Sequence, residues 1–440
     1  MAGADKQALD AIFKEVFEEG VAEGVNNKNP LRDIIKTEKS PFRGREVVRL
    51  SHTSRNVSPM FGGEDSLLAE AGNQGYSRMF IDQRKLTSRL RMTWEVMQDS
   101  TASEGAFISA RKSEMQYLID DMARRDEYAL ASDGRGVLAL VDDIDPDCGT
   151  GLTVDAPGGI TNDNFGNRFI SAGMKIAFVN PATGALRTQA AANPTVTAVS
   201  SSGTTVTLST ATIGTDVADS DYIVQAANNA ITDVLDTSYE HAWWGLMALV
   251  DDGTYRASYY GLDRTAVPAY SSYVTPSTAA LSVDLIQRVS DVVDQKMNGK
   301  INLLLAHHST RRLIIQLTDQ DRRYMGASLL RPDPGTVAFK QGDIPFGDVP
   351  VRAVRDFPLD VLMFLDLANA GFKEYVSEPG KWIDEDGSVL WRVGTGTSAR
   401  DAFEAWYRMR KQYFLEYPAY CARLDGITGQ ALVVQRAAGS

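Results

Sequence analysis

The sequence predicts an α+β fold that carries a small inserted β-domain. Three observations lead to this prediction. Residues 85–96 alternate between apolar and polar side chains, as in a strand with one buried face. A helical pattern of about 30 residues follows, which corresponds to a rod of roughly 45 Å. After residue 149 the composition changes to Thr, Val, Ala, Gly and Ser, and beyond residue 227 helical and strand patterns alternate again.

The bulk composition describes a globular protein and disfavours several classes. The chain has 440 residues, of which 43% are hydrophobic and 23% charged. That length predicts roughly two or three core-forming units. The net charge of -12 disfavours a classical nucleic-acid binder, whose affinity depends on excess Lys and Arg. Cys148 and Cys421 lie far apart, which favours free thiols over a disulfide framework. No apolar run approaches the ~20 residues that cross a bilayer, and the polar start predicts no signal peptide.

Residues 1–74 are expected to form an amphipathic helix followed by an extended arm. Apolar side chains between Leu9 and Val21 recur at helical spacing. Periodicity is lost from about residue 25 to 75, where basic residues, including Arg43 and Arg45, are spread among Asn, Ser, Pro and Gly. So long a stretch without regular structure is unusual inside a compact domain. We therefore expect an arm that becomes ordered against another surface.

Residues 75–99 are predicted to form an extended β-hairpin. The strand over residues 85–96 directs its apolar side chains, with Trp94 among them, to one side and its basic side chains to the other. Residues 76–81 are the expected partner strand, with a turn near Asp82 and Gln83. A two-stranded hairpin is marginally stable alone in water, so this one needs a surface to lie on.

Residues 100–149 are predicted to hold a long helix and the start of the next domain. Asp99, Ser100 and Ser103 are candidate N-caps, and Gly134 and Gly136 are expected to end the helix.

The composition of residues 150–227 then predicts the inserted β-domain, a small barrel or sandwich. Its clearest feature is a hairpin that turns at residues 201–203.

The remaining chain divides at residue 375. Residues 228–375 are expected to contain a helix from Ser282 to Gly299, a second helix that starts at Ser309 or Thr310, and buried strands. Those strands are predicted over residues 301–306, 349–354 and 359–365. Residues 376–440 are expected to contain a hairpin that turns at residues 384–387, between short strands at residues 382–383 and 389–391. In the same part, residues 401–416 read as strand or helix, and their Tyr, Phe and Trp content favours the strand.

Few residues suggest a catalytic or metal-binding site. His307 and His308 are adjacent, so they point in opposite directions at a strand end, and the start of a helix is favoured over a metal site. Asp143, Asp145 and Asp147 resemble a calcium loop, but the following Gly is one place late and no closing Glu follows. No Gly-x-Ser-x-Gly, Walker or zinc-binding spacing occurs. We predict no catalytic residue, no cofactor and no metal.

The order of these parts resembles the Hong Kong 97-type fold of tailed-bacteriophage major capsid proteins. The resemblance covers most of the chain outside the insertion and rests on order and spacing. The stretches that carry it are residues 130–138 at the end of the long helix, Thr254-Tyr255 with residues 261–265, residues 301–312, and residues 403–424.

The resemblance also assigns a role to each predicted part. It implies an N-arm (1–74), an extended loop (75–99), a spine helix with the start of the peripheral domain (100–149), a peripheral segment with the axial domain (228–375), and a return to the peripheral domain (376–440). No long scaffolding region precedes the arm, which implies a separate scaffolding protein or a short built-in one.

The function implied by this resemblance is structural. Such a subunit assembles into hexamers and pentamers of an icosahedral shell that encloses double-stranded DNA without sequence-specific binding. Its expected partners are copies of itself, a scaffolding protein, a portal protein and a decoration protein, with no membrane. Its expected location is the virion, after assembly in the host bacterial cytoplasm. An encapsulin-like compartment shell is one alternative, although the long arm and the insertion favour a virus. An enzyme on an α/β body is another, and it requires a convergent polar pocket.

Two sets of residues are candidates for contact between subunits. The arm and the hairpin supply cations and one aromatic residue: Arg43, Arg45, Arg84, Lys85, Arg89, Arg91 and Trp94. The long helix of a neighbouring copy supplies acids: Asp120, Asp121, Asp126 and Glu127. The alternative is that the basic strand is a solvent-facing edge protected against aggregation. Its position directly before the long helix favours the inter-subunit role.

Overall fold

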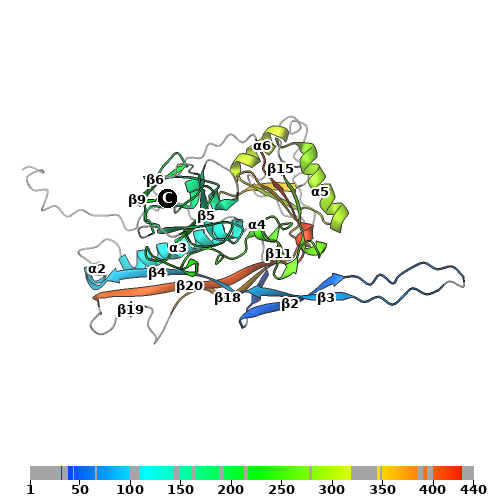
Figure 1. The fold of residues 1–440 in the computed structure, drawn as a ribbon, viewed down its shortest axis with the longest axis horizontal. Coiled ribbons are helices and arrows are strands. Elements are labelled where there is room, and N and C mark those ends of the chain that lie inside the picture. The colour runs from blue at the N-terminus through cyan, green and yellow to red at the C-terminus, as the bar shows by residue number, and fades with distance from the viewer. Residues whose placement is uncertain are drawn as a thin grey trace, which may run out of the picture. The chain divides into compact units, whose positions relative to one another are not determined.

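The computed structural model describes residues 31, 38–42, 44–64, 67–99, 110–142, 149–160, 165–187, 193–212, 217–276, 280–318, 344–346, 349–383, 390–393 and 400–428. These residues form two compact units. Unit 1 contains the described parts of residues 87–123 and 380–408, and unit 2 those of residues 29–86, 124–379 and 409–440. Figure 1 shows the helices and strands of both units. The predicted N-terminal helix lies outside the described residues. Among the helices of the described part, none has the length and apolar character needed to cross a membrane.

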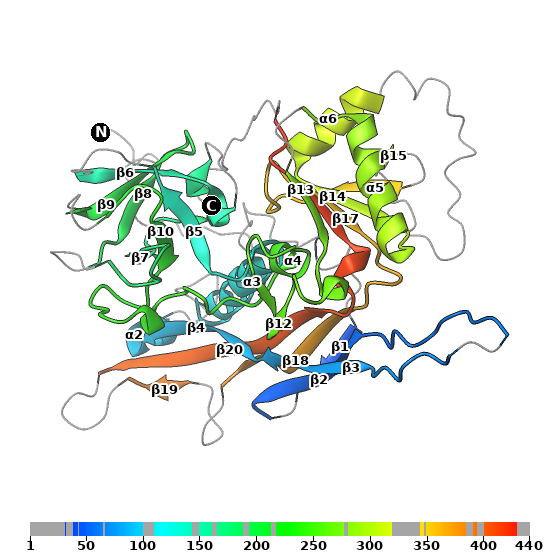
Figure 2. The ribbon, with the colours of Figure 1, turned by 45° about the vertical axis from the view of Figure 1, so that its right-hand side comes forward.

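One core of unit 2 is a six-stranded mixed sheet with two helices. The strands, in sheet order, are β13 (Tyr273–Pro276), β21 (Ala422–Asp425), β17 (Leu362–Leu365), β14 (Leu303–Ala306), β16 (Val349–Ala353) and β15 (Ile344–Phe346). Figure 2 shows α5 (Val283–Met297) and α6 (His308–Thr318) beside this sheet. Ile286, Val289 and Ile314 from these helices are buried in the same apolar cluster as the strand residues.

The two helices and the buried strands predicted in this region are confirmed, although α6 begins at His308 and not at Ser309 or Thr310. Ser282 Oγ accepts a hydrogen bond from the Leu285 backbone N–H at 3.2 Å, so it is the N-cap of α5. The helix ends at Met297, and Asn298 takes the left-handed conformation at its C-terminus, one residue before the expected Gly299.

A second six-stranded sheet of unit 2 is built from antiparallel pairs. Its order is β7 (Ile176–Val179), β10 (Tyr222–Gln225), β5 (Val137–Val141), β6 (Gly149–Asp155), β9 (Thr205–Thr212) and β8 (Val196–Val199). The hairpin predicted around residues 201–203 joins β8 and β9. The sheet includes β5, so its strands begin before residue 150, where the sequence placed the start of the β-domain.

The long helix is α3 (Ala110–Ala131), with 22 residues. Residues 100–109, where the expected caps Ser100 and Ser103 lie, are outside the described part. The strand before it is shorter than expected, because Trp94–Asp99 forms a separate helix, α2. The predicted glycine stop is confirmed by Gly134 and Gly136, which both have positive φ. A Cβ on Gly136 would lie 2.1 Å from the Ser238 carbonyl oxygen, so no larger residue fits there.

A third sheet contains the two longest strands. Its order is β1 (Glu38–Pro41), β18 (Phe372–Trp382), β20 (Ala402–Leu415) and β19 (Trp391–Arg392), and β4 (Arg84–Thr93) also pairs with β20. The strand reading of residues 401–416 is therefore confirmed. The turn predicted at residues 384–387 lies outside the described residues, but the strands on either side of it do not pair as expected, because β20 lies between β18 and β19 in the sheet.

The predicted partner of the basic strand is also wrong. Residues 76–81 belong to β3 (Gly75–Asp82), which pairs antiparallel with β2 (Glu46–Ser54). Only Gln83 separates β3 from β4, and the common hairpin turns need at least two residues, so β4 cannot fold back onto β3. The hairpin therefore lies earlier in the chain than residues 75–99, and β1 and β2 occupy part of the region expected to be an irregular arm.

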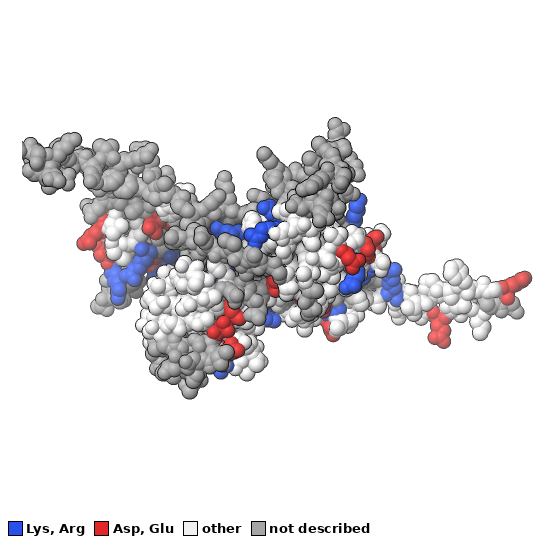
Figure 3. Space-filling view, turned by 90° about the horizontal axis from the view of Figure 1, so that it is seen from above, with Lys and Arg blue, Asp and Glu red and all other residues white. Residues whose placement is uncertain are grey.

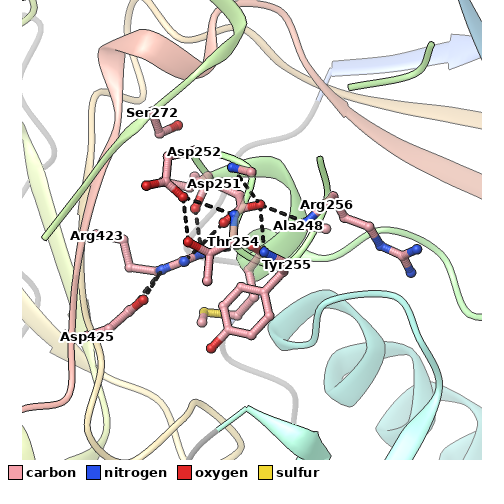
Figure 4. A network of polar contacts seen from close by, with 12 residues as sticks. Ala248, Asp251, Asp252, Thr254, Tyr255, Arg256, Ser272, Arg423 and Asp425 are labelled. Carbon is pink, nitrogen blue, oxygen red and sulfur yellow. Dashed lines mark hydrogen bonds and ion pairs between the residues drawn. The ribbon is translucent and has the colours of Figure 1, made fainter. Parts of the chain in front are cut away.

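A buried polar network fixes the segment between Met247 and Arg256 in unit 2 (Figure 4). Asp251 and Arg423 are both fully buried and form an ion pair at 3.1 Å. The other carboxylate oxygen of Asp251 accepts hydrogen bonds from the backbone N–H groups of residues 253, 255 and 256. Arg423 also donates to the carbonyl oxygens of Met247 and Val250. Because both charges are paired and hydrogen-bonded, no unpaired charge is buried here, and the network holds this loop in one conformation.

Candidate interaction surfaces

The β2–β3 hairpin is the strongest candidate for an interaction surface, and its inner face is fixed to unit 2. Met79 and Ile81 are buried there, and Ser51 Oγ donates to Tyr270 Oη at 2.6 Å. Arg49 pairs with Glu416 at 2.5 Å, and its guanidinium lies 5.0 Å from the centre of the Phe414 ring. These contacts hold the base of the hairpin in place.

The outer face of the same hairpin is apolar and exposed. Cross-strand neighbours on this face are Val48 with Phe80, Leu50 with Arg78, and His52 with Tyr76. Leu50 is 68% exposed and Tyr76 is 61% exposed. The hairpin thus directs polar Arg49 and Ser51 inward and several apolar side chains outward, which is the reverse of a strand that only covers its own core.

The tip of the hairpin, residues 55–74, extends this apolar surface. Its exposed large side chains are Val57, Met60, Phe61, Leu67 and Leu68. Phe61 is fully exposed and Leu68 is 96% exposed. In Figure 3 the hairpin projects at the right, and most of its visible surface is uncharged. Contiguous exposed apolar residues of this kind are typical of a surface that another molecule covers.

The basic strand β4 shows the predicted alternation. Leu90 and Met92 are buried, whereas Lys85, Arg89 and Arg91 are exposed. Within unit 1, Arg89 forms an ion pair with Glu404 on β20. The strand therefore presents a cationic outer face, although it belongs to a sheet and not to the hairpin.

Arg84, at the start of β4, is engaged inside unit 2. Its guanidinium donates to the carbonyl oxygens of Ala242, at 2.6 Å, and Glu240. Burial lowers its pKa, and the nearby Arg256 lowers it further. Arg84 thus anchors the junction between β3 and β4.

The other predicted contact residues are divided between surface and interior. Arg45, Trp94 and Asp121 are exposed and Asp120 is half-buried, whereas Arg43 lies outside the described residues. Asp126 and Glu127 are buried, the former beside Lys411 and the latter accepting from the Leu31 backbone N–H at 2.7 Å. These two acids are therefore not surface carboxylates, and the prediction that they contact a neighbouring subunit is wrong.

The apolar face of the hairpin was not predicted from the sequence. The sequence does contain a pattern for this face, because Val48 and Leu50 alternate with polar residues. That pattern predicts an exposed apolar face only once β3 is known to be the partner of β2. Because the inner positions of β2 include Arg49 and Ser51, the pattern does not resemble a strand that lies on its own core.

No group of three or more His, Cys, Asp or Glu side chains in the described ranges is placed to hold a metal ion. His307 Nδ1 lies 2.8 Å from Ser309 Oγ and accepts a hydrogen bond from the Ser309 backbone N–H, so His307, directly before α6, caps this helix in place of the expected Ser309 or Thr310. Burial lowers the pKa of His307 to about 3, and Arg168 and His308 add to this shift. The histidine is therefore neutral at physiological pH.

Comparisons with known proteins identify the fold. No protein-family model matches the chain, and no curated protein matches it. Among solved structures, the capsid of cyanophage A-1(L) matches with a TM-score of 0.53 and 9% identity, over 97% of this chain and 100% of that chain. The chain thus has the Hong Kong 97-type capsid fold, in agreement with the sequence-based expectation.

Two further structures match less well. The capsid of a native GTA particle has a TM-score of 0.49 and 13% identity, over 97% of this chain and 100% of that chain. An encapsulin complex from Synechococcus elongatus PCC 7942 has a TM-score of 0.47 and 9% identity, over 99% of this chain and 100% of that chain.

Proposed function

We propose that this chain is a major capsid subunit that assembles with copies of itself into a closed icosahedral shell. The capsid fold supports a shell-forming role, and the observation that carries the proposal is the apolar outer face of the β2–β3 hairpin. In water, an exposed apolar side chain such as Leu50 or Phe61 gives no stabilisation to its own subunit. Covered by a neighbour, each such side chain contributes about 1.5–3 kcal/mol.

The hairpin is suited to a contact between unlike surfaces of identical subunits. Its base is fixed by Arg49, Ser51, Met79 and Ile81, so its direction is set before assembly. Its tip is free to lie on a different part of the next subunit, which is a heterologous contact, and repeated heterologous contacts generate closed rings. Hexamers and pentamers are rings of this kind, and we propose them as the building units of the shell.

Charge supports two further parts of the proposal. The exposed Lys85, Arg89 and Arg91 of β4 can pair with Asp120 and Asp121 of a neighbouring copy, because the two sets have opposite charge. The net charge of -12 suits a container for double-stranded DNA, since an acidic wall repels phosphates and does not retain them. A scaffolding protein, a portal protein and a decoration protein belong to the same proposal, as does location in the virion.

Electron microscopy of the full chain, expressed alone and with its scaffolding protein, tests the proposal. Closed shells or capsomers are the expected result. Treatment with nuclease then separates two kinds of shell, because a virus-type shell from infected cells protects DNA, whereas an encapsulin-type shell contains cargo protein. A monomer of 48.1 kDa that does not assemble with or without scaffold would contradict the proposal.

A further inference from the structure

One buried cluster in unit 2 has no part in the proposed assembly. Lys411 on β20 is 1% exposed, and its ammonium lies between two carboxylates. Its Nζ is 2.5 Å from Asp126 Oδ1 on α3 and 3.1 Å from Glu374 Oε1 on β18. Asp126 and Glu374 are buried as well. The helix α3 is far in the sequence from β18 and β20, as its colour in Figure 1 shows.

Aromatic rings exclude water from this cluster. The Nζ of Lys411 lies 5.0 Å from the centre of the Trp243 ring and 4.8 Å from that of Tyr413. Tyr413 Oη accepts from Lys411 at 2.8 Å and donates to Asp126 Oδ1 at 3.2 Å. One cation and two carboxylates in a dry site are a costly arrangement, because burial removes the solvation of all three charges.

We propose that Lys411 and Asp126 condense to an isopeptide bond within the same chain, with Glu374 as the proton carrier. The amine and the carboxyl carbon are close enough for attack. The carboxyl carbon lies one C–O bond, about 1.2 Å, from Oδ1, so its distance from Nζ is below about 3.7 Å. Groups held at roughly 3–3.5 Å in fixed orientation react with very high effective concentration.

The atoms of the step balance without any further reactant. Glu374 takes a proton from the Lys411 ammonium and passes it to the Asp126 carboxylate, and the neutral amine then attacks the carbon of the neutral Asp126 carboxyl group. The new C–N bond forms, and Tyr413 donates its hydroxyl hydrogen bond to the oxygen that carries the developing negative charge. The C–O bond to the other Asp126 oxygen breaks. That oxygen leaves as water with two protons that come from the ammonium, one of them delivered by Glu374.

The low polarity of the site favours the product. In water, the amide is disfavoured because the separate ammonium and carboxylate are strongly solvated. Here both ions have already lost that solvation, and the reaction replaces them with a neutral amide. The bond would connect α3 covalently to β20, two elements that a shell under internal pressure would otherwise hold together by non-covalent contacts alone.

Intact-mass spectrometry of the full-length protein under denaturing conditions tests this inference. The expected mass is lower than that of the sequence by one water, and proteolysis is expected to release a branched peptide that contains both Lys411 and Asp126. Glu374→Gln keeps the size of the side chain but removes the proton carrier, and it should restore the full mass. Glu378→Gln, on the same strand, is the matched control and should retain the loss of water.

Chemical acetylation after denaturation gives a second measurement that does not depend on a variant folding. In the wild-type protein, Lys411 should resist acetylation, whereas the exposed Lys85 reacts. A wild-type protein of full mass, with Lys411 and Asp126 recovered on separate peptides, would overturn the inference and leave the cluster as a buried ion network. That result would not affect the proposed shell function, which rests on the hairpin.

Discussion

The hairpin tip provides a direct test of how the subunits associate. We predict that the double substitution Phe61→Ser and Leu68→Ser prevents assembly but leaves the subunit folded. Both side chains are almost completely exposed, so their loss should change the free energy of unfolding by no more than about 0.5 kcal/mol. If a neighbour covers both, their removal costs about 3–6 kcal/mol of association free energy.

The effect on assembly should be large enough to measure easily. Each 1.4 kcal/mol corresponds to a tenfold change in affinity. Ordering of side chains offsets part of the gain on association, so we take the lower limit and expect the concentration needed for assembly to rise at least ~100-fold. Light scattering and sedimentation over a concentration series measure this quantity, and urea unfolding of the unassembled subunit measures stability.

Leu235→Ser is the matched control, because Leu235 is also a large apolar side chain, 68% exposed, but lies outside the hairpin. It should assemble like the wild type. The reasoning is refuted if the double variant assembles at the wild-type concentration, or if it fails to assemble only because it unfolds.

Three further predictions concern the stability of unit 2. Asp251→Asn removes the fully buried carboxylate that pairs with Arg423 and leaves Asp425 as its remaining charged partner, so it should lower the free energy of unfolding in urea by about 3 kcal/mol, the low end for breaking a buried pair. Asp252→Asn, on the same loop but less buried, should cost much less. Burial lowers the pKa of His307 to about 3 in the folded chain, whereas in the unfolded chain this histidine has its ordinary pKa of about 6.5. Below pH 6.5 the unfolded chain therefore binds a proton at His307 and the folded chain does not. Stability should thus fall by about 2 kcal/mol between pH 6.5 and 5, and an unchanged pH profile in His307→Asn, which keeps a capping acceptor, would argue against this assignment. Gly136→Ala brings a methyl group against a backbone carbonyl and should cost about 3 kcal/mol or more in thermal unfolding, but Gly173→Ala, with similar φ and open space, should cost only about 1–2 kcal/mol.

The sequence by itself determined the elements whose cause is local. The alternation of Leu90 and Met92 with basic residues gave strand β4, because successive side chains of a strand point to opposite faces. Ser282 and Gly134 determine helix ends locally. Ser282 accepts a hydrogen bond from a free backbone N–H at the start of α5, and Gly134 adopts the positive φ that follows the end of α3. The order of such elements was also sufficient to predict the capsid fold.

The tertiary structure alone decided how these elements pair and which charges are buried. β2 was overlooked because two of its inward positions, Arg49 and Ser51, are polar, and they are satisfied by Glu416 and Tyr270, more than two hundred residues away. Asp126 resembled a solvated acid for the same reason, since its partner is Lys411. A sequence shows which side chains are polar, but whether water or a distant part of the chain satisfies them depends on contacts that no local pattern records.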